Sequence, residues 1–233
     1  MKYLTPDERK LHRHAIDGTA PGARHSHCLT YWQGQVILTG GLNHNHEPTD
    51  QVFGLVLSSM TWEKWDLDGP LYARYSHTAH LHDNMLLLVG GVNTEEKPPG
   101  LAVISLISHT ALEFSFPTQD KQSLLMLHRH TSVMRQNVGK ATPQLVLLGG
   151  GGNCFSFGTH LNRTPVLVDV EAACASLQRA LKTGIKGIAN RLDQDLEGHR
   201  STVISMEQFC ETSSRRSVHT MISDTGMPTD VLS

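Results

Sequence analysis

The sequence predicts an all-β fold in which about three small antiparallel sheets follow one another along the chain, with one helix and a polar tail after them. Three observations predict this fold: a pattern of residues that recurs with a period near 50, a double glycine that closes each copy of the pattern, and a change to helical periodicity after residue 170. With 233 residues, the chain is long enough to bury a substantial core.

The repeat consists of an arginine-containing segment, a turn, an apolar run and a pair of glycines. Its marker residues are Arg24 with Gly40 and Gly41, Arg74 with Gly90 and Gly91, and Arg129 with Gly149 and Gly150. The arginines stand 50 and 55 residues apart and the glycine pairs 50 and 59 residues apart, so the third copy carries a short insertion. We expect the arginines to bond one unit to the next and the glycines to serve backbone geometry where neighbouring chains approach closely.

Each copy is expected to supply about four strands. Gly34 in one copy and Asp83 with Asn84 in the next suit the tight turn of a hairpin, and the following apolar run suits a strand buried on both faces. Weaker strand candidates, rich in apolar and aromatic residues, lie between the copies at residues 52–57, 61–65, 101–106 and 111–116. Four strands per period are the content of one propeller blade. The sequence therefore predicts a partial β-propeller over residues 1–170, with units around 20–70, 71–125 and 126–170.

This pattern resembles the kelch repeat, in which a double glycine follows an apolar strand and an aromatic residue comes farther on. Trp62 and Trp65 take the aromatic place in the first unit, and Phe114 or Phe116 in the second. The resemblance implies a ring of about four to eight blades, so three units form an open arc with two uncovered faces. A fragment or splice form of a longer protein, closure by self-association, and a C-terminal cap would each account for the arc, and the fragment is favoured.

The run of four glycines, asparagine, cysteine and phenylalanine at residues 149–155 is more specific. Together with the flanking sequence it resembles the wybutosine-synthesizing tRNA methyltransferase family, also called the leucine carboxyl methyltransferase 2 family, over roughly residues 1–170. The family has an N-terminal S-adenosylmethionine-binding domain and a C-terminal kelch propeller. The resemblance implies carboxyl methylation and methoxycarbonylation of a modified guanosine in phenylalanine tRNA.

This chain corresponds only to the propeller half of that family. The resemblance therefore implies phenylalanine tRNA as a partner and S-adenosylmethionine as a cofactor of the whole protein, but it gives this chain no catalytic, cofactor-binding or metal-binding residues. We expect the chain alone to be inactive. The alternative is a kelch module without an enzymatic role, which binds another protein through the open faces or through the segment 171–197.

The glycine run and the histidines also suggest a cofactor site or a metal site. The glycine run at 149–152 is also how a cofactor loop begins, with Asp169 at the spacing of a ribose-binding acid, but residues 153–165 lack the helical period that such a loop needs. The histidine groups suggest a metal, yet no Cys-x-x-Cys or His-x-Glu companion accompanies them; they are His12 and His14, His25 and His27, and His77, His80 and His82. Cys154 has no basic neighbour in the sequence and is expected to be a small buried residue.

After residue 170 the apolar residues recur every three or four positions. The segment 171–197 is predicted to be an amphipathic helix, which either packs on the end of the arc or binds a partner. Its apolar stripe consists of Ala173, Leu177, Leu181, Ile185, Ile188, Leu192 and Leu196. Residues 198–233 are rich in serine and threonine and are expected to be a mostly disordered tail.

Composition and charge narrow the class of protein further. A formal net charge of −2 argues against a strongly basic nucleic-acid clamp. No apolar run approaches the ~18 residues of a membrane span, and the first ten residues lack the apolar core of a secretory signal, so no membrane contact is expected. Four cysteines lie far apart, namely Cys28, Cys154, Cys174 and Cys210, which favours free thiols and a cytoplasmic location.

Overall fold

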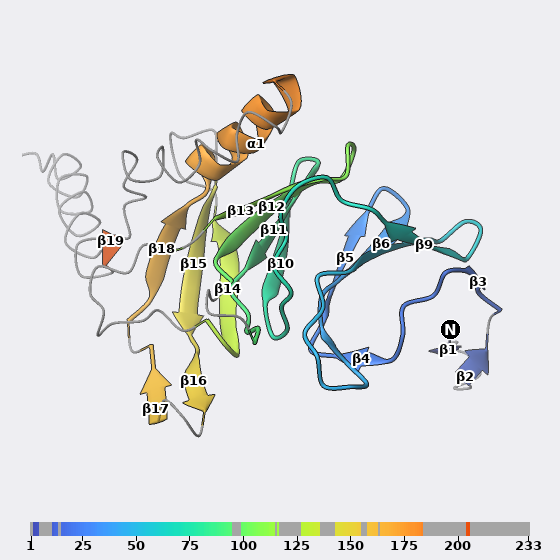
Figure 1. Cartoon of the computed structure of the whole chain (residues 1–233), viewed down its shortest axis with the longest axis horizontal. Coiled ribbons are helices and arrows are strands. Elements are labelled where there is room, and N and C mark those ends of the chain that lie inside the picture. Colours follow the sequence, from blue (N-terminus) through green and yellow to red (C-terminus); the bar gives the residue numbers. More distant parts are fainter. Residues whose placement is uncertain are drawn as a thin grey trace, which may run out of the picture.

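The computed structural model describes residues 2–4, 11–13, 15–94, 99–114, 116, 127–135, 143–154, 158–162, 164–183 and 204–205. These residues form strands and a single α-helix, which confirms the all-β class. Three main sheets lie side by side in chain order, and the helix crosses one end of the second and third sheets (Figure 1). No helix within the described residues is long and apolar enough to cross a membrane.

Unit 1 is an antiparallel sheet of four strands with a short fifth strand at its edge. Its strands are β5 (Cys28–Trp32), β6 (Gln35–Thr39), β8 (Val52–Val56) and β9 (Thr61–Trp65), paired in that order. The predicted turn between β5 and β6 forms at Gln33 and Gly34, whose φ angles of 43° and 80° suit a tight hairpin. The short strand β3 (Asp17–Gly18) runs parallel to β9 at the outer edge.

Unit 2 repeats this plan. Its strands are β10 (Thr78–His82), β11 (Met85–Val89), β12 (Leu101–Ser105) and β13 (Thr110–Phe114), again antiparallel and in chain order. Every residue of β11 and β12 is buried, as expected for a sheet covered on both faces. Asp68 forms a parallel bridge to Thr110, which repeats the pairing of Asp17 with Thr61 in unit 1.

Unit 3 is less regular. It consists of β14 (His130–Arg135), β15 (Gln144–Gly149), β18 (Val166–Asp169) and β19 (Ile204–Ser205). A separate hairpin of β16 (Gly151–Cys154) and β17 (Gly158–Leu161) follows β15, and helix α1 (Glu171–Thr183) lies between β18 and β19 in the chain. Two small pairs complete the strands: β1 (Lys2–Leu4) with β2 (Leu11–Arg13), and β4 (Arg24–His25) with β7 (Leu42–Asn43).

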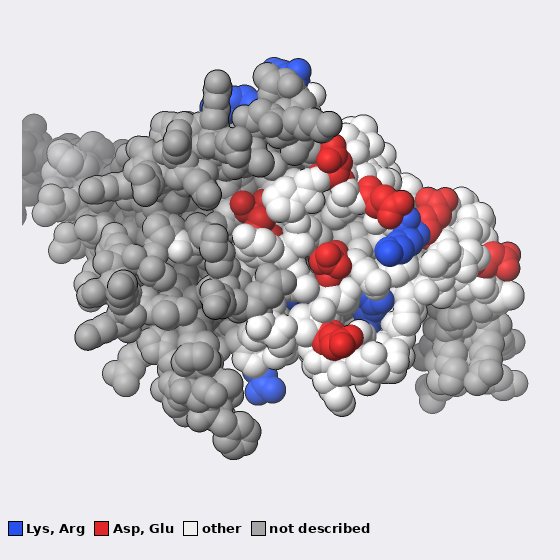
Figure 2. All heavy atoms as spheres, viewed as in Figure 1, with Lys and Arg blue, Asp and Glu red and all other residues white. Residues whose placement is uncertain are grey.

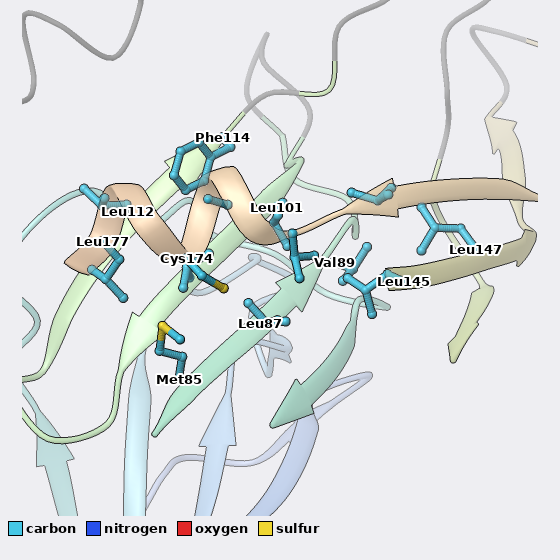
Figure 3. Packing of buried hydrophobic residues seen from close by; sticks show 14 of the residues in the cluster. Met85, Leu87, Val89, Leu101, Leu112, Phe114, Leu145, Leu147, Cys174 and Leu177 are labelled. Atoms are coloured by element: carbon cyan, nitrogen blue, oxygen red, sulfur yellow. The ribbon is translucent and has the colours of Figure 1, made fainter. Parts of the chain in front are cut away.

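Two apolar clusters hold the units together. The first lies between units 1 and 2 and includes Ile37, Trp65, Leu86 and Ile104. The second joins the other face of unit 2 to unit 3 and to helix α1 (Figure 3). Unit 2 is therefore covered on both faces, whereas units 1 and 3 each have only one neighbour among the described sheets.

Helix α1 confirms part of the predicted stripe and corrects another part. Ala173 and Leu177 are buried, but Leu181 is 45% exposed, and Cys174 and Ala180 are buried instead. A residue four positions on is rotated by about 40° around a helix of 3.6 residues per turn, so a stripe spaced by fours drifts off the buried face. The rest of the predicted stripe, residues 184–197, lies outside the described residues. Within the predicted tail 198–233, the structure describes only Ile204–Ser205, which pairs with β18.

Candidate functional site

The recurring feature of this structure is the contact between successive units, which we call the joint. Strand pairing fixes how the units correspond, because Cys28 pairs with Thr39, Thr78 with Val89, and Thr131 with Leu148, each pair lying directly ahead of a double glycine. This register aligns His27, His77 and His130 with one another. The same element of the repeat thus meets the preceding unit at both joints.

The register also corrects the expected position of the third arginine. It aligns Leu127, and not Arg129, with Arg24 and Arg74. Arg129 instead corresponds to Ser26 and Ser76, and these three residues share φ angles of 55°, 56° and 56°. Arg129 therefore lies two residues beyond the position that Arg24 and Arg74 occupy in their units. Its Arg-His-Thr sequence resembles the Arg-x-Ser sequence of the other copies, but the pairing of the strands sets a different alignment.

Arg74 lies inside its own unit. Its guanidinium donates from Nη1 to Gly90 O at 3.2 Å and from Nε to Tyr72 O at 3.2 Å, and Nη2 forms an ion pair with Glu113. The arginine side chain is 1% exposed and the glutamate 3%. The expectation that the repeat arginines bond one unit to the next is therefore wrong for the side chain. It ties the segment ahead of β10 to Gly90 and to the last strand, β13, of the same unit.

Arg24 makes the matching contacts in unit 1. It donates to Gly40 O and Gly22 O, each at 3.2 Å, and its Nη2 donates to Gln51 Oε1 at 2.9 Å. Unit 3 has no guanidinium at this position, and there Asn162 Nδ2 donates to Gly149 O at 3.0 Å. In every unit, a side chain thus donates a hydrogen bond to the carbonyl of the first glycine. The donor is the repeat arginine in units 1 and 2 and Asn162, which follows β17, in unit 3.

The glycine doublets are the points at which the backbones of two units meet. Gly41 N–H donates to Arg74 O at 2.9 Å, and Gly91 N–H donates to Leu127 O at 2.8 Å, each bond crossing a joint. A Cβ at Gly40 would lie 2.5 Å from Arg74 O, and a Cβ at Gly90 would lie 2.3 Å from the Leu127 Cβ. Both positions also have positive φ, so only glycine fits there without a shift of the backbone.

A histidine crosses each joint beside the glycines. His77 Nε2 lies 3.0 Å from Thr39 Oγ1, and His130 Nε2 lies 3.1 Å from Thr78 Oγ1. His130 Nδ1 lies 3.1 Å from Leu127 O, and since a carbonyl can only accept, Nδ1 carries the proton and Nε2 accepts from the threonine hydroxyl. Burial, together with the charge of Arg74 and the neighbouring histidines, lowers the pKa of His77 to about 3. Burial also lowers the pKa of His130.

These histidines make stability depend on pH. Because the folded pKa of His77 is depressed, the unfolded chain binds more protons below about pH 6.5, and stability falls as the pH is lowered from there toward 3. We expect chemical unfolding to show a loss of about 2 to 3 kcal/mol between pH 6.5 and 4.5 from this residue.

The variant His77→Gln removes the titrating group and should flatten the pH slope, although it lowers stability at pH 7. The exposed His25 is the matched control, since His25→Gln should leave the slope unchanged. An unaltered slope in His77→Gln would show that the joint imidazole is not held neutral.

The glycine run does not open a helix. Gly149 and Gly150 have φ angles of 66° and 79°, and residues 151–154 continue as strand β16 of an antiparallel hairpin. The run therefore continues into an antiparallel hairpin and not into the strand-to-helix turn that a cofactor loop needs. The side chains of Asp169 and Cys154 lie outside the described residues, as does Cys210.

The other singled-out side chains serve the joints or the surface. His80 Nε2 bonds to Ser132 Oγ at 2.6 Å across the second joint, and Cys28 donates to His77 O at 3.0 Å across the first. Burial raises the pKa of the Cys28 thiol to about 11, so it is not an activated nucleophile. Among the described residues, no group of three or more His, Cys, Asp or Glu side chains is placed to hold a metal ion. His12 and His14 lie outside the described side chains.

The joint contains residues that the sequence pattern did not single out. Thr39, Thr78, Leu127 and Glu113 all take part in it or support it. An alignment of the three copies on their histidines, in place of their arginines, gives the correct register and would have found Leu127. Nothing in the sequence pairs Arg74 with a glutamate 39 positions away.

The described chain is an all-β protein built of successive four-stranded antiparallel units, joined side by side through glycine doublets and a buried histidine. No protein-family model matches its sequence. The chain is 41% identical over 163 residues to human tRNA wybutosine-synthesizing protein 4, and 41% identical over 174 residues to the rat protein of the same name. The resemblance expected from the sequence is thereby confirmed.

These alignments include 69% and 73% of this chain but only 23% and 25% of the two relatives. The chain therefore spans about a quarter of the length of the curated relatives that it matches.

Proposed function

We propose that this chain is the kelch-repeat propeller portion of an S-adenosylmethionine-dependent tRNA methyltransferase that acts in wybutosine biosynthesis on phenylalanine tRNA. The observation that carries this proposal is the 41% identity to two proteins named for wybutosine synthesis, over about 70% of the chain. In this proposal the units are blades, and carboxyl methylation and methoxycarbonylation belong to a cofactor-binding domain outside this chain. The setting is the cytoplasm.

The geometry of the units supports their assignment as blades. Units 1 and 2 are four-stranded, antiparallel and in chain order, which is the plan of a propeller blade. The first strand of unit 2 contacts the first strands of both neighbours, as the inner strands of a ring would. The face between successive units is apolar. Each joint repeats the bond donated by the second glycine of the doublet and places a histidine beside the first glycine.

The surface charge defines what kind of tRNA contact to expect. Over the described part of the face in Figure 2, acidic side chains are spread across the middle and basic ones lie singly among them. The formal net charge is −2, and the described part of this face offers no broad basic surface for phosphates. In this proposal the units therefore shape a site around one modified base and leave most of the affinity to the methyltransferase domain.

The second candidate is a kelch module that binds another protein and has no part in methyl transfer. The observation that favours it is the pair of exposed apolar ends on the outer units, with Leu29 and Tyr31 58% and 65% exposed on unit 1 and Val133 53% exposed on unit 3. Apolar side chains gathered at an exposed face are typical of interaction surfaces.

A methyl-transfer and binding experiment separates the two candidates. The purified chain, labelled S-adenosylmethionine and precursor phenylalanine tRNA are expected to yield no methylated product above a boiled control, because this proposal places the cofactor-binding domain outside the chain. In parallel, a catalytic domain supplied separately should gain activity when this chain is added. Product from the chain alone would overturn the proposed division of labour, and no gain from the added chain would favour the protein-interaction module.

A further inference from the structure

The second joint contains a continuous row of hydrogen-bonded side chains. His80 Nε2 lies 2.6 Å from Ser132 Oγ, Ser132 Oγ bonds to Thr78 Oγ1, and Thr78 Oγ1 lies 3.1 Å from His130 Nε2. The row ends at Leu127 O, which lies 3.1 Å from His130 Nδ1. Its members alternate between the two units, since His80 and Thr78 belong to β10, and Ser132 and His130 belong to β14.

The Leu127 carbonyl fixes the direction of every hydrogen bond in this row. Because a carbonyl only accepts, the neutral His130 ring carries its proton on Nδ1, and its Nε2 accepts from the Thr78 hydroxyl. A hydroxyl has one proton to donate, so Ser132 donates to Thr78, and His80 donates from Nε2 to Ser132. His80 therefore carries its proton on Nε2 and keeps Nδ1 as an acceptor.

This direction excludes His80 and Ser132 as a catalytic pair. A distance of 2.6 Å between a ring nitrogen and a hydroxyl is also that of a general base and its nucleophile. A base needs an unprotonated nitrogen opposite the hydroxyl, whereas His80 presents an N–H, and Ser132 gives its own proton to Thr78. The two side chains are arranged to pass protons along the row and not to activate Ser132.

The two ends of the row differ in their access to water. His130 is buried, and its ring lies between the units beside Gly90. His80 is only half-buried, and its Nδ1 has no protein partner among the described residues. A proton from water can therefore enter the row at His80 Nδ1.

We propose that these four side chains form a proton relay that connects water at His80 with the buried His130. A proton binds to His80 Nδ1, and the proton on His80 Nε2 passes to Ser132 Oγ. The Ser132 proton passes to Thr78 Oγ1, and the Thr78 proton passes to His130 Nε2. Each hydroxyl loses one proton and gains one, so both stay neutral while the positive charge moves from His80 to His130. Every hydrogen bond of the row is kept, with its direction reversed.

The relay makes the second joint the contact that takes up a proton while the chain stays folded. At the first joint, His77 Nε2 bonds to Thr39, but His77 Nδ1 is buried without a partner, so a proton on this ring would leave a buried N–H unsatisfied. Ala79 takes the position of Ser132 there and has no polar atom to continue a row.

The charged groups around His130 determine what the proton does to the joint. Burial lowers the pKa of His130, its bond to Leu127 O acts in the opposite direction, and the charges of His80 and His128 lower it further. His130 in turn acts on His77, whose pKa Arg74 also lowers. Among the described residues, the groups that act on His130 include no carboxylate. Because the folded pKa is lowered, the proton binds below about pH 6.5 and the second joint weakens as the pH falls.

Nitrogen-15 NMR of the histidine rings in the full chain tests the direction of the row. Near pH 7, His80 should carry its proton on Nε2 and His130 on Nδ1. As the pH is lowered, His130 should gain a proton on Nε2 before His77 titrates. His80 protonated on Nδ1 alone near pH 7, or His77 titrating before His130, would overturn the proposal.

Ser132→Ala interrupts the relay and leaves the bonds of His130 to Leu127 and Thr78 in place. In this variant the reversed Thr78 hydroxyl has no acceptor, so proton binding at His130 should weaken at least about threefold, while His77 is unaffected. Thr131→Ala is the matched control, since Thr131 is the exposed neighbour of Ser132 on the same strand. Equal proton binding at His130 in the two variants would contradict the relay. The inference rests on the side chains of this joint and not on tRNA.

Discussion

Replacement of Arg74 by leucine is expected to lower the free energy of unfolding by about 3 to 5 kcal/mol. The variant removes three hydrogen bonds and leaves the buried Glu113 carboxylate without its cation. A buried ion that loses its partner costs far more than the pair contributes, because the remaining charge stays out of water. Urea unfolding monitored by tryptophan fluorescence measures the effect.

A double-mutant cycle with Glu113 separates the ion pair from the packing. Arg74→Leu/Glu113→Leu should be more stable than Arg74→Leu alone, since it removes the unpaired charge. Arg24→Leu is the matched control in unit 1, where the arginine bonds to a neutral glutamine and is only half-buried, and it should cost about 1 kcal/mol. Equal losses for the two single arginine variants would contradict the role assigned to Glu113.

Replacement of Gly90 by alanine is expected to lower the free energy of unfolding by about 2 to 4 kcal/mol, through backbone strain and overpacking. The new Cβ would lie 2.3 Å from the Cβ of Leu127 and 2.9 Å from its carbonyl oxygen, at a residue whose φ is +62°. The backbone of unit 3 has to move away, so the second joint opens. Differential scanning calorimetry should show a lower melting temperature and a less cooperative transition.

Gly34→Ala is the control for backbone strain at a position where the new Cβ contacts no other residue. Gly34 has a φ of +80°, and a Cβ there meets nothing within 4 Å, so this variant should lose only about 1 kcal/mol. If Gly90→Ala were no worse than Gly34→Ala, the close approach of the two units at the second joint would be refuted.

The repeated pattern predicted most of the architecture because turns and strands depend mainly on residues that are close in the sequence. The turn at Gly34 and the apolar run of β11 depend on residues close in the sequence, and each lies where the pattern placed it. The role of the arginines was misjudged because it depends on a distant partner. Arg74 bonds to Glu113 from the last strand of its own sheet, a contact that only the pairing of four strands brings about.

The third unit shows where a pattern in the sequence ceases to define register. Arg129 is followed by histidine and threonine, which imitates the start of the other copies, yet the ladder of β14 with β15 places Leu127 at the arginine position. A strand register is set by all of its pairs together, so one matching residue carries little weight. The hairpin of β16 and β17 was missed for a similar reason, since a glycine run has no strand signal of its own.

Amide hydrogen exchange of the three glycine doublets tests the joints most directly. The Gly41 and Gly91 amides should exchange about tenfold or more slowly than the Gly150 amide, because among the described residues only the first two donate across a joint. Rapid exchange at Gly41 and Gly91, equal to that at Gly150, would show that the units do not meet at their glycines and would contradict this account.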